Sequence, residues 1–472
     1  MAASNQGAEV PVMQVLEKAH YFTQALVPVP GAVPYPPLTA PSSLRLRTRV
    51  VSLTHNNLTY AALGFLVHWW DAHPLPAGGL TPAPYDDPEK YGRVSAWGYA
   101  EVLDSTLAGG PQEGDFVFGY LPLATLAQDV EFRVDDEVPG HVLATSAYRA
   151  RLMPFYNRYF PVARDSAVAT QLRAAVQNQS SSSSSSSSSS KSAAFSDDSL
   201  GFDALYFALF ECGHLVAKFM FDAQNPTHPG MGPDAPAQTP WTREMADLTG
   251  ATVVLLAPAS KTALAMGFAM RKRAAPGSAG PKRVVGAASE ASREFVEGTG
   301  IYDATVSTTE TPDAEFLGKR LGVDVDAGEK VVLIDCGGRA GVGQRWAAAF
   351  RKLCQPGRFL LVGIGSEAGE HSPADVLKRL APKEGGGDGG EKETEAPWFM
   401  QVNTGDLRER AAVRVGRGTV FEGTEAAYAA FKEEGVKGFK VRWGEGMEAV
   451  KGGWERLAKG ETRPEEGMAF LL

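Results

Sequence analysis

Residues 257–262, A-P-A-S-K-T, combine two hydroxyls and an amine directly after an apolar run, a combination that can bind a phosphate group. The run 252–257 is rich in β-branched and apolar residues, which is typical of a parallel strand covered by helices on both faces. Ser260 is a suitable N-cap for a following helix, and the first amides of a helix attract phosphate oxygens. The side chains of Ser260, Lys261 and Thr262 would add donors and a positive charge to these amides.

This turn lacks the glycines of the common nucleotide-binding motifs. A dinucleotide fingerprint would read G-x-G-x-x-G, and a Walker A loop is excluded because glycine is absent where G-x-x-x-x-G-K requires it. Side chains would therefore do part of the work that backbone amides do in a glycine-rich turn. An ordinary capped helix with an exposed Lys261 remains the alternative.

The end of the next predicted strand, R-V-V-G-A-A at 283–288, indicates which dinucleotide is preferred. In such a site an acidic residue after the second strand accepts from the ribose 2′-hydroxyl and repels a 2′-phosphate. Ser289 and Arg293 suit a phosphate, whereas Glu290 comes one residue late for that acid. The pattern favours NADP(H) over NAD(H), with solvated residues of a helical first turn as the alternative.

Two further turns follow apolar runs, D-C-G-G at 335–338 and G-I-G-S at 363–366. Glycine lets a flat ligand approach the backbone, and ligands of open α/β sheets bind at the carboxyl edge of the strands. Gly337 and Gly363 are therefore predicted cofactor contacts, although simple strand terminators would look the same.

Searches for metal ligands and activated nucleophiles find no motif. The eight histidines form no H-x-x-x-H or H-E-x-x-H pair, there is no C-x-x-C, and no G-x-S-x-G elbow is present. The three cysteines lie far apart on hydrophobic segments, so we interpret them as buried thiols in a reducing compartment. The sequence predicts no metal site.

The composition sets limits on partners and location. Among 472 residues, 46 are basic and 55 acidic, a net charge of −9 that provides no basic field for nucleic acid or an anionic membrane. The longest apolar segment, 202–221, contains Asp203, Glu211 and Lys218, which would be costly in hydrocarbon. We expect a packed helix there, no membrane partner and a cytoplasmic protein.

The order of patterns along the chain predicts an α/β protein with two domains. Short strands broken by Gly, Pro and Asp fill residues 1–165, and a serine-rich insertion, expected to be disordered, spans 166–200. Apolar runs then alternate with amphipathic helical patterns over 201–403, as in a doubly wound parallel sheet, with a flexible loop at 383–395. Residues 404–472 are expected to return to the first domain.

This order, together with V-V-S-L-T-H-N-N-L-T-Y-A at 50–61, W-G-Y-A-E-V at 97–102 and A-S-K-T-A at 259–263, resembles the medium-chain dehydrogenase/reductase superfamily. The zinc-free quinone oxidoreductase and enoyl reductase branches are nearest, and a domain-of-unknown-function branch is nearer still. The resemblance implies a GroES-like β domain joined to a Rossmann domain. It also implies a cleft between them for NADP(H) and a carbonyl or unsaturated substrate.

The resemblance also assigns candidate residues. Zinc-dependent members carry a Cys and a Gly-His-Glu where residues 57–60 and 97–99 stand here, so zinc catalysis is not expected. Zinc-free relatives place an Asn and a Tyr in the nicotinamide cleft near the positions of Asn57 and Tyr60. By this resemblance Tyr60 is the candidate proton donor, and Asn57 would orient substrate or cofactor.

Four aromatic residues are candidates for the walls of an apolar substrate site, with core packing as the alternative role. They are Tyr156, Tyr159, Trp69 and Trp97.

The sequence therefore predicts a zinc-independent, NADP(H)-dependent oxidoreductase acting on an activated C=C or C=O of a small hydrophobic substrate. A noncatalytic nucleotide-binding or scaffold relative is one alternative, and a non-redox lyase or isomerase using the same cleft is another. A homodimer is one option for the assembly.

Overall fold

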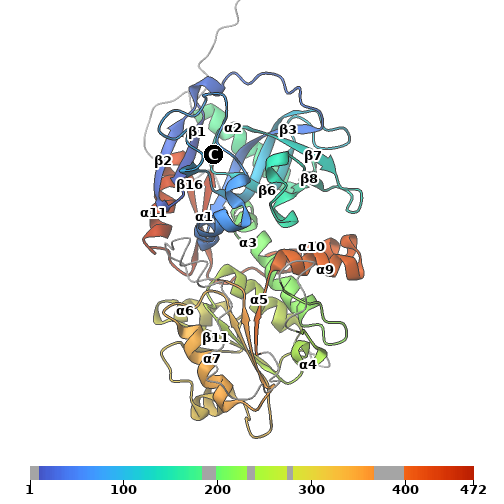
Figure 1. The fold of residues 1–472 in the computed structure, drawn as a ribbon, viewed down its shortest axis with the longest axis vertical. Coiled ribbons are helices and arrows are strands. Elements are labelled where there is room, and N and C mark those ends of the chain that lie inside the picture. The colour runs from blue at the N-terminus through green and yellow to red at the C-terminus, as the bar shows by residue number, and fades with distance from the viewer. Residues whose placement is uncertain (1–9, 183–197, 231–239, 274–279, 366–397) are drawn as a thin grey trace, which may run out of the picture.

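The computed structural model describes residues 10–182, 198–230, 240–273, 280–365 and 398–472. A β domain, which contains the early and the last segments of the chain, is stacked on a domain built around a parallel sheet (Figure 1). This architecture confirms the predicted combination of a GroES-like β domain with a Rossmann sheet.

The β domain contains a three-stranded sheet, β2-β1-β4, and an eight-stranded sheet, β16-β17-β3-β5-β6-β9-β8-β7. Because β7 also pairs with β3, the strands from β3 to β7 of the larger sheet close into a barrel. The strands are β1 (Val12–Glu17), β2 (His20–Pro28), β3 (Ser43–Leu53), β4 (Tyr91–Gly92), β5 (Ser95–Ser105), β6 (Phe116–Pro122), β7 (Gln128–Val134), β8 (Val142–Ala144), β9 (Arg158–Pro161), β16 (Lys440–Glu445) and β17 (Glu466–Leu471).

The end of the chain belongs to the β domain. β17 pairs antiparallel with β3, and β16 lies parallel to β17. Helix α11 (Gly446–Ala458) lies between them in the chain and packs against β2. The indole of its Trp454 is fully buried and donates to the carbonyl of Tyr21, 3.0 Å away.

The second domain has a six-stranded parallel sheet of order β12-β11-β10-β13-β14-β15. This is the Rossmann order, with the switch point between β10 and β13. The strands are β10 (Thr252–Leu256), β11 (Arg283–Ala288), β12 (Ala304–Ser307), β13 (Val331–Asp335), β14 (Phe359–Gly363) and β15 (Phe399–Gln401), and the helices include α4 (Arg243–Ala246), α5 (Lys261–Arg273), α6 (Glu290–Thr299) and α7 (Val342–Leu353).

Both faces of this sheet are covered, which explains the unbroken apolar run of its central strand. On β10, Val253 and Leu255 belong to one hydrophobic cluster, and Val254 and Leu256 belong to another on the opposite face. All four side chains are fully buried. Each alternate residue therefore faces a different layer of helices.

Helix α3 (Ser199–Leu215) continues into a π-helical turn (Val216–Met220) and packs on both α5 and β3. By length and composition the segment Ser199–Met220 could cross a membrane, but 78% of its most apolar window is buried inside the protein. Contacts within the fold therefore account for its apolar character.

Part of the predicted disordered insertion is helical. Residues 167–182 form α2 (Ala167–Ser182), in which Ala169, Leu172 and Ala175 are buried at helical spacing. The expectation of disorder is wrong for this part, because these apolar residues supply a packing face that the serine tract lacks. Residues 183–197 and the predicted loop 383–395 lie outside the described residues.

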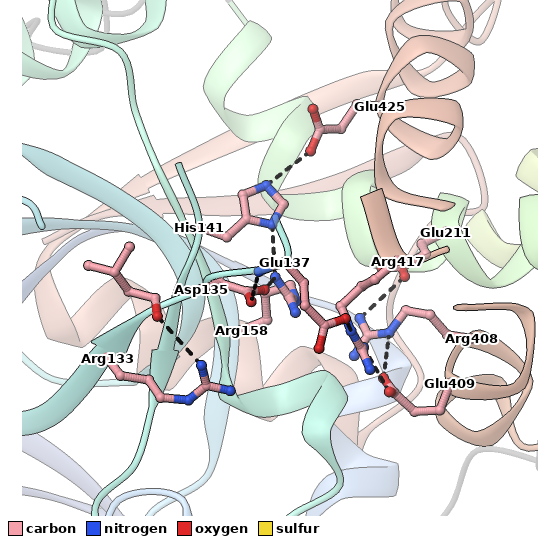
Figure 2. A network of polar contacts seen from close by, with 11 residues as sticks. Arg133, Asp135, Glu137, His141, Arg158, Glu211, Arg408, Glu409, Arg417 and Glu425 are labelled. Atoms are coloured by element: carbon pink, nitrogen blue, oxygen red, sulfur yellow. Dashed lines mark hydrogen bonds and ion pairs between the residues drawn. The ribbon is translucent and has the colours of Figure 1, made fainter. Parts of the chain in front are cut away.

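A network of buried charges joins the domains beside the hairpin of α9 (Thr404–Val415) and α10 (Arg417–Glu434), as Figure 2 shows. Arg158 of β9 pairs with Asp135 at 2.6 Å, and each side chain is only 3% exposed. Arg408 of α9 pairs with Glu211 of α3 at 3.3 Å. The ring of Phe421 lies 4.3 Å from the Arg158 guanidinium and 5.3 Å from that of Arg408.

Candidate active site at the junction of the two domains

The hydroxyl of Tyr60, on α1 (His55–Val67), is the centre of a buried hydrogen-bonded group. It accepts from Asn56 Nδ2 at 3.2 Å and from Trp97 Nε1 at 3.1 Å, and the Tyr156 hydroxyl is also in hydrogen-bonding contact with it. The rings of Trp69, Tyr120 and Tyr156 pack edge-on around Tyr60 at 4.7–5.8 Å. Two N–H groups donate to the Tyr60 oxygen, so the Tyr60 proton and the Tyr156 hydroxyl share its remaining hydrogen-bonding position.

The surroundings of Tyr60 keep its phenol protonated. Burial raises the pKa of Tyr60 to about 12, against the lowering effect of its hydrogen bonds to Trp97, Tyr156 and Asn56. The phenol therefore keeps its proton at neutral pH. Cys212 of α3 is close enough to affect this pKa, and its thiol accepts from Thr404 at 3.0 Å, where α9 begins. Tyr60 thus lies where the two domains meet.

Asn57 positions the start of α1. Its Oδ1 accepts from the Thr54 amide at 2.7 Å in a capping box, and its Nδ2 donates to the Ser95 carbonyl at 3.0 Å. Both ends of the amide are occupied, so Asn57 fixes α1 against β5 and with it the position of Tyr60.

The four aromatic residues predicted to wall the substrate site have different surroundings, and one of them, Trp69, packs edge-on against Tyr60. Trp97 and Tyr156 both contact Tyr60, and each is less than one tenth exposed. Tyr159 is fully buried elsewhere in the barrel, where its hydroxyl donates to the Tyr120 carbonyl at 2.6 Å. Trp97 and Tyr156 therefore belong to the Tyr60 group, and Tyr159 packs in the core beside it.

The turn after β10 leaves part of the α5 N-terminus unoccupied. Ala257 adopts a left-handed φ of 52°, a conformation that glycine adopts more readily. The Ser260 hydroxyl accepts from the Ala263 amide at 3.3 Å, so it caps the helix as predicted. In the described structure the amides of Lys261 and Thr262 have no hydrogen-bond partner.

Lys261 and Arg339 both lie within electrostatic range of His55. Burial lowers the pKa of Lys261 to about 8, and its amine lies 5.3 Å from the centre of the Phe439 ring. Burial together with the charges of Lys261 and Arg339 lowers the pKa of His55 to about 4. His55 is the first residue of α1, in the β domain, and Arg339 follows β13.

The other predicted cofactor glycines, Gly337 and Gly363, make contacts within the fold. Asp335 Oδ1 accepts from the amides of Gly337 and Gly338 at 2.9 and 2.6 Å, so a carboxylate already occupies the donors of this turn. A Cβ on Gly363 would lie 2.5 Å from the side-chain oxygen of Gln401, so this glycine makes room for β15.

At the end of β11 the predicted ribose-phosphate contacts lie next to each other on α6. Ser289 is its N-cap residue, and its hydroxyl lies 3.0 Å from that of Ser292. Arg293 forms an ion pair with Glu297 at 3.1 Å along the same helix. Arg293 would have to exchange this carboxylate for a phosphate to act as predicted.

A cavity of about 290 Å³ lies on the β domain, and neither Tyr60 nor Lys261 lines it. Its walls include Trp70, Tyr91 and Tyr148. Within the described ranges, no group of three or more His, Cys, Asp or Glu side chains could hold a metal ion.

Comparison with solved structures identifies the class of fold. A candidate NADPH:quinone reductase from Bacillus thuringiensis is 10% identical, covers 98% of this chain and 100% of its own, and superposes with a TM-score of 0.52. The mitochondrial 2-enoyl thioester reductase Etr1p/Etr2p heterodimer from Candida tropicalis is 8% identical, with the same coverage and TM-score. The fold is that of the medium-chain dehydrogenase/reductase superfamily, as the resemblance predicted.

Within this class, the chain belongs to the family described as protein of unknown function DUF2855, whose model matches residues 51–463. No curated protein matches the chain.

Sequence reasoning missed three residues of this site: His55, Asn56 and Arg339. His55 and Asn56 stand directly before the predicted Asn57 in H-N-N-L-T-Y. Asn56 is four residues before Tyr60, so on a helix the two side chains lie on the same face, and this spacing could have identified Asn56. His55 comes within range of Lys261 and Arg339, which follow the neighbouring strands β10 and β13, only through the docking of the domains, for which the sequence carries no local signal.

Proposed function

We propose that this protein is a zinc-independent, NADP(H)-dependent oxidoreductase that transfers hydride to an activated C=C or C=O of a small hydrophobic substrate. The observation that carries the proposal is the Tyr60 hydroxyl, held by the N–H groups of Asn56 and Trp97 so that it can donate a proton. The reductases with similar folds, named for NADPH-linked quinone or enoyl thioester chemistry, add support.

The residues at the α5 N-terminus fit the cofactor's phosphates. The amides of Lys261 and Thr262 are free in the described structure, and the Lys261 amine has no carboxylate partner there. Ser289 and Arg293 would hold the ribose 2′-phosphate once Arg293 leaves Glu297. When bound, NADPH would supply the hydride.

Tyr60 would provide the proton that balances hydride addition. Its phenol donates to the oxygen or carbon on which negative charge develops, and Trp97 and Asn56 remain bonded to the phenolate oxygen and stabilise it. Asn57 keeps α1 in place through Thr54 and Ser95. The rings of Trp97 and Tyr156 exclude water from this exchange.

Titration of the full chain with NADPH and NADH, followed by fluorescence and thermal shift, tests the proposal first. We expect NADPH to bind more tightly than NADH, and NADPH to be oxidised in the presence of a quinone, an enone or an enoyl thioester. If neither nucleotide binds, the proposal is wrong.

Tyr60→Phe tests the proposed donor. We expect turnover to fall by about 10²- to 10⁴-fold, because general acid catalysis is lost, while the affinity for NADPH is unchanged. Stability should fall by about 1–3 kcal/mol, since the buried Trp97 and Asn56 donors lose their acceptor. Tyr148→Phe, at an exposed tyrosine, is the matched control and should leave turnover, the affinity for NADPH and the stability unchanged.

A noncatalytic relative with the same fold is the second candidate. It is favoured by the burial of Tyr60, which is only 3% exposed and enclosed by three aromatic rings. NADPH binding without oxidation of any substrate class, together with unchanged function of Tyr60→Phe, would support this candidate against the oxidoreductase.

A further inference from the structure

The cavity on the β domain has aromatic and aliphatic walls that come from separate segments of the chain. Its rings belong to Trp70, Tyr91 and Tyr148, and Pro74 and Pro88 extend the apolar lining. The volume of about 290 Å³ lies at the lower end of the range of about 300–1,000 Å³ that is usual for small-molecule pockets. The cavity therefore suits a molecule with one or two rings.

The indole of Trp70 is held in place from two sides. A Cβ on Gly64 of α1 would lie 2.5 Å from this indole, and a Cβ on Gly92 of β4 would lie 2.7 Å from it. Glycine at both positions lets the backbone of two elements close on the ring. This wall of the cavity is therefore formed before any ligand binds.

The charged side chains that line the cavity offer more donors than acceptors. The Lys18 amine donates to the Pro88 carbonyl at 2.6 Å and lies 5.8 Å from the centre of the Trp70 ring, so two of its three N–H groups have no described acceptor. Arg151 donates to Asp71 at 2.8 Å, and its side chain is 68% exposed. Two cations and one carboxylate leave the lining with a net positive charge.

Two buried arginines add positive charge behind the cavity. Arg93 donates to the carbonyl of Pro74, and Arg149, the neighbour of Tyr148 in the chain, donates to the carbonyl of Ala72 at 2.7 Å. Both are at most 1% exposed, and their described acceptors are uncharged. The Nη1 atom of Arg93 is buried without a described partner. An anion in the cavity would therefore be attracted from behind as well as from the rim.

The carboxylates around Lys18 compensate its burial only in part. Burial lowers the pKa of Lys18, although Glu89, Asp71 and Asp87 act in the opposite direction. The described acceptor of its amine is a backbone carbonyl and not a carboxylate. A carboxylate bound in the cavity would supply this missing partner.

We propose that this cavity binds a small aromatic monocarboxylate. Its ring would pack against Trp70, Tyr91 and Tyr148, and its carboxylate would accept from Lys18 and Arg151. A monoanion neutralises the lining, whereas a cation would meet two like charges. None of these five residues belongs to the candidate active site, so the proposal does not depend on the proposed function.

NMR titration of the full chain with benzoate, benzamide and benzylammonium tests the charge of the ligand. The three probes share one ring and differ in the charge of its substituent. We expect benzoate to bind at least about tenfold more tightly than benzamide, because only the carboxylate forms charge-assisted hydrogen bonds. Benzylammonium should bind more weakly than either. The proposal is overturned if benzoate does not bind at millimolar concentration, or if another probe binds as tightly.

Two substitutions with opposite effects place the carboxylate in the cavity. Lys18→Gln should weaken the binding of benzoate by about tenfold or more. Asp71→Asn should strengthen it by up to about fivefold, because Arg151 is released from a surface ion pair. Lys459→Gln, at an exposed lysine directly after α11, is the matched control and should leave the affinity unchanged.

A gain in affinity cannot come from unfolding, so Asp71→Asn decides the test if Lys18→Gln does not fold. An unchanged affinity in folded Lys18→Gln, or no gain in Asp71→Asn, contradicts the proposal.

Titration of the NADPH-loaded chain separates this site from the proposed function. The affinity for benzoate should be the same with and without NADPH, because neither Tyr60 nor Lys261 lines the cavity. Displacement of benzoate by NADPH would place the carboxylate in the nucleotide site and overturn the proposal. Benzoate binding that depends on Lys18, in a chain that does not bind NADPH, contradicts only the proposed function.

Discussion

The amine of Lys261 lies at the first turn of α5, 5.3 Å from the centre of the Phe439 ring and without a described carboxylate. Partial burial lowers its pKa to about 8, so its charge is sensitive to pH in a range where most lysines are fully protonated. The sequence identified Lys261 from its position after an apolar strand. It could not predict the lowered pKa, because Phe439 comes from the distant C-terminal segment.

The affinity for NADPH should therefore depend on pH through Lys261. Binding should weaken above about pH 8, where the free amine loses its proton. The decline should continue at higher pH, because a bound anion raises the pKa of the amine. In Lys261→Gln the affinity should be lower and this part of the pH dependence absent. A wild-type profile that stays flat to pH 10 contradicts the assignment.

Tyr60 illustrates how much of the candidate site was predictable from the sequence. The resemblance of H-N-N-L-T-Y to zinc-free reductases indicated Tyr60 and Asn57, and Trp97 was a candidate for the wall of an apolar substrate site. The structure adds that Asn56, one turn before Tyr60, holds the hydroxyl, while Asn57 caps the helix. These two adjacent asparagines have the same local pattern, so only their directions in the fold separate their roles.

At the scale of elements, the Asp203 carboxylate of α3 connects this helix to β5 and to α10. Asp203 is 6% exposed and accepts from Tyr99 of β5 at 2.8 Å, Tyr428 of α10 at 2.7 Å and Lys432 of α10 at 2.7 Å. A carboxylate within an apolar helix is costly unless it is paired. Here three donors satisfy it, which joins the barrel to the α9–α10 hairpin.

Asp203→Asn should destabilise the protein by about 2–4 kcal/mol, because one acceptor oxygen and the charge that pairs with Lys432 are lost. Urea unfolding followed by far-UV circular dichroism measures the change. Asp198→Asn, whose carboxylate accepts one exposed bond from Trp443, should cost less than about 1 kcal/mol. Equal effects of the two substitutions would show that the junction at Asp203 contributes little.

Elements with a strong local pattern were predictable, and those that depend on distant partners were not. The central parallel strands, such as β10, were found because each is an apolar run covered on both faces. Helix α9, T-G-D-L-R-E-R-A-A-V-R-V, looks polar, yet Arg408 within it is almost fully buried. Strand β16 has no fully buried residue, and it is a strand because β17 pairs with it.

At the scale of the whole molecule, Arg408 connects the charged network to the candidate site. It pairs with Glu211 and lies 4.8 Å from the Phe155 ring, as part of the junction in Figure 2. Phe155 packs against Trp97 at 5.3 Å, and Trp97 donates to Tyr60. A displacement of α9 relative to the barrel would therefore shift Phe155 and Trp97, and with them the hydrogen bond from Trp97 to the Tyr60 hydroxyl.

Arg408→Met should lower the free energy of unfolding by about 3–5 kcal/mol, because Glu211 is 3% exposed and would be left buried without its described partner. Adding Glu211→Met removes this unpaired carboxyl group, so the double variant should recover most of the loss. Urea unfolding followed by tryptophan fluorescence and by far-UV circular dichroism should give coincident transitions in the unchanged chain, since the junction couples the domains. If the double variant is as unstable as the sum of the single variants, the cost lies in packing against Phe155 and Phe421 rather than in the buried charge.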